Sequence, residues 1–200
     1  MKNNIILLQY GNTKTYIIKG EKSNLLIDTD IYGTLNEFFK AIKQANIKVS
    51  DINYVTATHY HPDHIGLISE LMDFNIKLLL VDNQLNSIHF SDEIFKRDSN
   101  NRYKPINENN ALIITTIKSR SFLKSLGING EIIKTNSHST DSIAVILDDG
   151  NCFVGDLEPY EYIKAYPNNL TLTKDWNNIL AYNPKVIHFS HNIDKIINKE

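Results

Sequence analysis

Thr58-His59-Tyr60-His61-Pro62-Asp63-His64 is the stretch of this 200-residue sequence that decides the fold. It places three imidazoles and a carboxylate directly after the apolar run NYVTAT (53–58), which predicts a buried strand. In an extended segment, side chains two residues apart point the same way, so the first two histidines can bind one cation. The proline keeps its predecessor extended and suits the first turn of a helix, which then presents the last two residues to a second cation. The stretch therefore predicts a metal site at a strand-to-helix turn.

Three later segments carry further candidate ligands: His138 follows the strand pattern EIIKTN (131–136), Asp156 ends NCFVGD (151–156), and His191 follows KVIHFS (185–190). In motif and in the order of these segments, the chain resembles the metallo-β-lactamase superfamily over most of its length. The resemblance implies two metal sites joined by a bridging carboxylate. One ion would be bound by His59, His61 and His138, the other by Asp63, His64 and His191, with Asp156 as the bridge.

The resemblance also implies an α/β (α+β) fold, an αββα sandwich of two mixed sheets flanked by helices, with both metals at one edge. Asp28, at the end of NLLIDTD (24–30), matches a family Asp that supports the histidine loop; a plain turn carboxylate at a strand end is the alternative. Ser137, Ser190, Asn192 and Asp30 stand where glycine is common in the family. These differences affect loop shape and substrate fit more than the ligand atoms.

Hydrophobic periodicity predicts the remaining elements. In the first half we expect an antiparallel meander of three strands, a helix at 34–46, the strand before the histidines, a helix from about 62 to 72 and the strand IKLLLV (76–81). In the second half we expect a helix ending at Gly127, the strands EIIKTN, SIAVILD (142–148) and NCFVGD with a hairpin turn at Asp149-Gly150, a helix around Trp176, and KVIHFS as the last strand.

We expect a single domain over residues 1–200, with a surface insertion at 82–119 that is broken by the polar run at 98–101. Charged residues make up 22% of the chain and nearly cancel to a net charge of -2, which argues against nucleic acid and anionic lipid as partners. The single Cys152 excludes an intramolecular disulfide and reads as a buried packing residue. Met1–Tyr10 lacks the features of a secretion signal, and no apolar run is long enough to span a membrane, so we expect a cytoplasmic protein.

By the resemblance, the expected function is hydrolysis of a small ester, thioester, lactone or related compound, with a hydroxide between two zinc ions as nucleophile. Iron or manganese are alternatives to zinc, and Asp63 and His191 are expected to act in catalysis as well as in metal binding. Two other readings stay open: a metal-containing ligand-binding or sensing protein without turnover, and an iron-dependent oxidoreductase. Six aromatic residues could line a substrate pocket or simply pack: Tyr32, Phe90, Phe95, Tyr103, Tyr160 and Tyr162. His89 and His188 match no ligand position.

Overall fold

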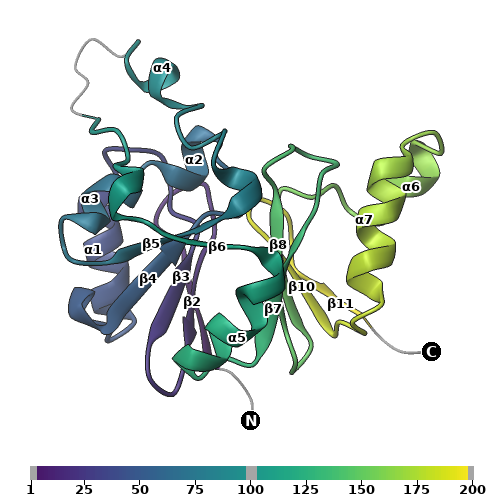
Figure 1. The fold of residues 1–200 in the computed structure, drawn as a ribbon, viewed down its shortest axis with the longest axis horizontal. Coiled ribbons are helices and arrows are strands. Elements are labelled where there is room, and N and C mark those ends of the chain that lie inside the picture. The colour runs from purple at the N-terminus through teal and green to yellow at the C-terminus, as the bar shows by residue number, and fades with distance from the viewer. Residues whose placement is uncertain (1–3, 98–102, 198–200) are drawn as a thin grey trace.

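The computed structural model describes residues 4–97 and 103–197. Two mixed β-sheets pack face to face, and helices cover the outer face of each sheet, with α1 and α3 on one side and α7 on the other (Figure 1). This is the αββα sandwich expected from the sequence.

The first sheet has six strands in the order β1-β2-β3-β4-β5-β6. The meander is confirmed, because β1 (Asn4–Leu8), β2 (Thr15–Lys19) and β3 (Asn24–Ile27) pair antiparallel. The next three strands continue the sheet in parallel; they are β4 (Ile52–Thr56), β5 (Lys77–Val81) and β6 (Leu112–Ile114). The helix α1 (Leu35–Gln44) and the short η1 (Val49–Asp51) connect β3 to β4.

The helix expected at 62–72 is two helices, α2 (Pro62–Ile65) and α3 (Ile68–Met72). The turn between them contains Gly66, which lies against the backbone of residues 31 and 32. A Cβ atom on Gly66 would be 2.0 Å from the backbone nitrogen of Tyr32. Only glycine permits this approach, which brings the loop after β3 against the loop that carries the histidines.

The second sheet has the order β11-β10-β9-β8-β7. Its strands are β7 (Gly130–Lys134), β8 (Ile143–Leu147), β9 (Asn151–Gly155), β10 (Val186–Phe189) and β11 (Lys195–Ile196). The predicted hairpin joins β8 to β9, with Gly150 at φ +98°. Between β9 and β10 the chain forms α6 (Tyr162–Ala165) and α7 (Leu170–Leu180). KVIHFS is not the last strand, because β11 pairs antiparallel with β10.

Alternation along the strands separates the core into layers, as a period of two requires. On β2, Ile17 faces the layer under α1 and α3, whereas Ile18 faces the space between the sheets. On β8, Val145 faces the first sheet and Ala144 faces α7. Cys152 is fully buried in this last layer beside Trp176, which confirms its packing role.

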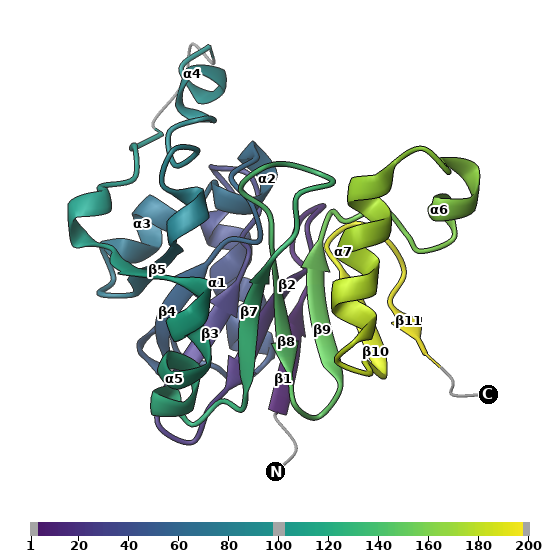
Figure 2. The ribbon, with the colours of Figure 1, turned by 45° about the vertical axis from the view of Figure 1, so that its right-hand side comes forward.

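The segment expected as a surface insertion at 82–119 is partly structural. It forms η2 (Asp82–Gln84), α4 (Asp92–Phe95), η3 (Glu108–Asn110), strand β6 and the start of α5 (Thr116–Leu126). β6 extends the first sheet, and Phe95 and Ile106 are buried in its outer core layer, while α4 projects from the body of the molecule (Figure 2). The polar run at 98–101 lies outside the described residues. α5 ends as predicted at Gly127, which adopts φ +80°.

The loops that follow β3, β4, β7, β9 and β10 gather at one edge of the sandwich, the upper edge in Figure 1. All of the candidate ligands lie on these loops. Among residues 4–97 and 103–197, no helix combines the length and the apolar character that a membrane crossing requires.

Candidate metal centre

Three of the predicted ligands converge at the end of β4. The ring nitrogens His59 Nε2 and His61 Nδ1 are 3.0 Å apart, and His138 Nε2 lies 3.1 Å from the first and 3.2 Å from the second. The extended backbone of His61, with ψ 154° before Pro62, gives the two-residue spacing that the sequence predicted. His138 reaches the same point from the loop between β7 and β8. We call these residues the three-histidine group.

A second group forms beside the first from Asp63, His64 and His191. His191 Nε2 lies 3.1 Å from Asp63 Oδ2 and 3.3 Å from His64 Nε2. His64 is fully buried, whereas the side chains of Asp63 and His191 are 39% and 33% exposed. The second group therefore forms the solvent-facing side of the site.

Asp156, at the end of β9, lies between the two groups. Its Oδ2 is 3.3 Å from His64 Nε2, 3.8 Å from His59 Nε2 and 3.9 Å from His138 Nε2. Its Oδ1 is buried, accepts no hydrogen bond from the described residues and lies 3.5 Å from His191 Nε2. The structure thus brings together all seven residues singled out in the sequence.

The outer nitrogens of two histidines each face an oxygen atom. His191 Nδ1 donates to the backbone oxygen of Asn12 at 3.2 Å, and His64 Nδ1 lies 3.0 Å from Asp28 Oδ2. Such partners fix the tautomer and leave Nε2 with a free lone pair for a cation.

Electrostatics differ sharply between the buried histidines. Burial, reinforced by the positive charges of His64 and His138, holds the pKa of His59 far below its usual range, so its ring is neutral. Burial also opposes protonation of His64, but the charges of Asp28 and Asp156 and their hydrogen bonds outweigh it and raise its pKa to about 10. The pKa of Asp156 stays below its usual range, because the hydrogen bond and charge of His64 outweigh the effect of burial. In the metal-free protein, a proton on His64 thus offsets part of the negative charge of Asp28 and Asp156.

Asp28 lies beneath the histidine loop, as expected for a supporting residue. Its Oδ1 accepts from the backbone nitrogen of Thr58 at 2.6 Å, and its Oδ2 accepts from the hydroxyls of Thr58 at 2.9 Å and Ser190 at 3.0 Å. Ser190 therefore ties the His191 loop to the same carboxylate. Asp28 itself adopts φ +59°, a left-handed conformation that a surrounding network must maintain.

Two further buried carboxylates support the ligands and were not singled out in the sequence. Asp141 Oδ2 accepts from the backbone nitrogen of Tyr60, between His59 and His61, at 2.7 Å. Asp175 on α7 accepts from backbone nitrogens just before His138. Each partner is distant in sequence, so local periodicity gave no signal for these contacts.

The family model of the metallo-beta-lactamase superfamily matches residues 9–191. This chain belongs to the metallo-β-lactamase superfamily. Among curated proteins it is similar to the lactamase-like protein adaB of Aspergillus niger, with 24% identity over 88% of this chain and 50% of the relative. It is also similar to the lactamase-like protein nscB of Trichophyton verrucosum, with 25% identity over 72% of this chain and 46% of the relative. The chain thus spans about half the length of these relatives.

Solved structures share the superfamily fold at low identity. A metallo-β-lactamase family protein from Thermus thermophilus superposes with a TM-score of 0.73 and 16% identity, over 96% of this chain and 74% of the other. The chemotaxis sensor ODP, solved as a peroxy diiron species, gives a TM-score of 0.69 and 17% identity, over 98% and 85%. These likenesses establish the fold.

The donor set fits the metal ions that the superfamily implies. In a tetrahedral zinc site with Zn–N bonds of about 2.0–2.1 Å, ligand nitrogens lie roughly 3.3–3.4 Å apart. The nitrogens of the three-histidine group are separated by 3.0–3.2 Å, and those of His64 and His191 by 3.3 Å. Nitrogen lone pairs at these separations repel unless a proton or a cation lies between them, and the buried Asp156 Oδ1 is a further unused acceptor. Imidazole and carboxylate together suit zinc, and they also accept iron or manganese.

The aromatic candidates separate into two kinds. Phe95 is buried and packs with Tyr32 and Tyr103 at ring distances of 5.1 and 4.2 Å, so these three are core residues of the segment around α4. Phe90 is 59% exposed, and its ring centre lies 5.6 Å from that of His61. Tyr160 packs on Trp176, and Tyr162 packs on Tyr166. Phe90 is therefore an exposed aromatic side chain that lies beside a ligand candidate.

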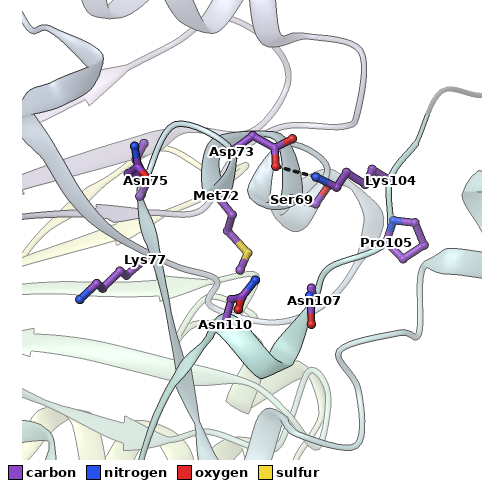
Figure 3. A pocket seen from close by; sticks show the side chains of 10 residues that line it. Ser69, Met72, Asp73, Asn75, Lys77, Lys104, Pro105, Asn107 and Asn110 are labelled. Atoms are coloured by element: carbon purple, nitrogen blue, oxygen red, sulfur yellow. Dashed lines mark hydrogen bonds and ion pairs between the residues drawn. The ribbon is translucent and has the colours of Figure 1, made fainter.

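A separate cavity of about 340 Å³ lies between α3, β5 and the segment 104–110, and contains none of the seven ligand candidates (Figure 3). An ion pair between Asp73 and Lys104 crosses its rim. His89 and His188, which were given no ligand role, pair with other side chains: His89 with Asp92 and Glu108, and His188 with Asp194 and Asn151.

Proposed function

We propose that this chain is a metal-dependent hydrolase with a dinuclear zinc site, acting on a small ester, thioester, lactone or related compound. The observation that supports it most is the convergence of two adjacent ligand groups on the shared carboxylate of Asp156, with distances of 3.3–3.9 Å to three of the histidines. Each group offers three donors and leaves a position for water or substrate, as hydrolytic zinc sites do.

Zinc, when bound, lowers the pKa of water from 15.7 toward about 7 and so supplies a hydroxide nucleophile at neutral pH. The residues of this chain provide the rest. His59 is neutral and buried, so it offers a lone pair without competition from a proton. Asp63 is the most exposed of the second group's three side chains, and its Oδ2 can take a proton from a water and pass it to bulk solvent. His191 Nε2 lies 3.1 Å from that oxygen, so the two atoms can bind the same cation.

The substrate class follows from the charge and shape around the site. The chain has no excess of positive charge, with 21 basic and 23 acidic residues, which does not favour a polyanionic substrate. Phe90 offers an exposed apolar ring beside the three-histidine group. A neutral or weakly charged ester, thioester or lactone with an apolar portion fits these features.

The test measures metal content and turnover on the same preparation. We expect two zinc equivalents by elemental analysis and hydrolysis of at least one member of a panel of esters, thioesters and lactones. His61→Ala and Asp156→Ala should each abolish turnover, whereas Asp148→Ala, which removes an exposed carboxylate paired with Arg120, should not. Two bound metals without turnover on any panel member would remove the support for this substrate class.

Iron is the second candidate for the metal, because the ODP sensor shares this fold and was solved as a diiron species. Protein isolated with iron in place of zinc, and consuming oxygen in the presence of a reductant, would favour the oxidoreductase. Stabilisation by a small ligand with no product formed would favour a sensing role.

A further inference from the structure

Asp175 is a buried carboxylate that none of the proposed catalytic steps uses. It lies in the middle of α7 and is 2% exposed, beside Trp176 and close in sequence to Leu172 and Ile179, which pack on the second sheet. A carboxylate in such a layer is unfavourable unless hydrogen bonds compensate its lost hydration. Packing alone therefore does not explain a carboxylate at position 175 of the helix.

The compensation comes from the loop that carries His138. Asp175 Oδ2 accepts from the backbone nitrogen of Asn136 at 2.8 Å and from that of Ser137 at 2.7 Å. These are short, charge-assisted bonds to the two residues immediately before His138. An apolar side chain at position 175 would leave both donors without this partner.

The loop is also held at both of its ends, because the backbone nitrogen of Thr135 donates to the backbone oxygen of Ser142. The backbone nitrogen of Ser142 donates to Ser139, and that of Ile143 donates to Thr58. Asp175 holds the backbone of Asn136 and Ser137, the two residues that precede His138. The direction from which the imidazole reaches the site therefore depends on the contact with α7.

We propose that Asp175 is a positioning residue for the three-histidine group. By fixing the backbone at 136 and 137, it sets His138 Nε2 at 3.1–3.2 Å from the nitrogens of His59 and His61. The inference rests on the metal centre of the proposed function, but not on the reaction catalysed there.

The role is selective for one of the two ions. Asp175 contacts the chain beside His138, which belongs to the three-histidine group, and the second group is drawn from the loops after β4 and β10. Partners that orient a metal ligand typically change affinity by about 10–100-fold. Loss of Asp175 should therefore weaken one metal equivalent and leave the other close to its original affinity.

The experiment is a titration of metal-free protein with cobalt(II), followed by its visible absorption, which reports the two sites through their different ligands. Asp175→Leu keeps the branched outline of the side chain, with more bulk, and removes the acceptor; we expect one equivalent to weaken by about 10–100-fold. Asp175→Asn keeps an acceptor oxygen and should stay within a few-fold of the original protein. Asn177→Ala, an exposed change on the same helix, serves as the control.

Unchanged binding of both equivalents in Asp175→Leu would overturn the proposal, as would equal weakening of both. Failure of the unmodified protein to bind metal would overturn it too. If Asp175→Leu does not fold, amide hydrogen exchange is measured on the unmodified metal-free protein. The Asn136 and Ser137 amides should then be protected like those of β7. Rapid exchange of these two amides would refute the proposed role of Asp175. Two bound metals without turnover on any panel member would remove the support for the proposed substrate class and leave this result readable.

Discussion

Replacing Asp28 by alanine should destabilise the metal-free protein severely, because this carboxylate joins three loops. The change leaves the buried backbone nitrogen of Thr58 and the hydroxyls of Thr58 and Ser190 without their acceptor. An unpaired buried amide costs about 1–3 kcal/mol, and each hydroxyl about 1 kcal/mol. The left-handed backbone at φ +59° adds about 1 kcal/mol for alanine. The expected loss is roughly 4–6 kcal/mol, a large part of the 5–15 kcal/mol typical of a domain.

Asp28→Asn separates the hydrogen bonds from the charge. Asparagine tolerates the left-handed conformation, and its oxygen can still accept from the backbone nitrogen of Thr58, so the loss should be only about 1–2 kcal/mol. Its amide group would, however, face His64 Nδ1 and favour the tautomer with the proton on Nε2. Zinc affinity at the second group should then fall although the fold survives.

The assay is guanidinium unfolding of chelator-treated protein at pH 7, followed by zinc titration of the asparagine variant. Asp51→Ala is the control, since Asp51 also accepts from a backbone nitrogen, that of Lys48, but at an exposed position. Its expected cost is below about 1 kcal/mol. An Asp28→Ala protein no less stable than this control would refute the reasoning.

Three other predictions concern pH and substrate. The folded-state pKa of His64 is raised to about 10, so protonated His64 contributes fully to the stability of the metal-free protein below about pH 6.5. This contribution is lost as the pH rises through 10, and unfolding measured at several pH values checks it. The hydrogen bonds from Lys14 and His188 outweigh the effect of burial and hold the pKa of Asp194 below its usual range. Asp194→Asn should therefore lower the free energy of unfolding at pH 7, by a margin that shrinks as the pH falls below about 4. Phe90→Ala should raise KM about 5–30-fold for aryl esters and leave acetyl esters nearly unchanged; equal effects on both would argue against substrate contact.

Much of the fold could be predicted because it depends on local pattern. Alternation and helical periodicity located nine strands, β1 to β10 apart from β6, and the helices α1, α5 and α7, to within a few residues. The same reasoning failed where a tertiary contact decides the outcome. Gly66 interrupts the helix after His64 because the backbone at Tyr32 passes against it. β6 is a strand because β5 offers it a parallel partner, although its own sequence is short.

By itself, the sequence determined the types, order and spacing of the metal-binding candidates, since HxHxDH combines a two-residue strand repeat with the start of a helix. Only the tertiary structure decided which atoms meet: that His61 uses Nδ1 where His59 and His138 use Nε2, and that Asp156 lies between both groups. It also revealed Asp175 as a support of His138. Local periodicity specifies which way a side chain points from its own element. The contacts of Asp175 with Ser137 and of His59 with His138 join residues 38 and 79 positions apart, so only the packing of two sheets and a helix sets their distances.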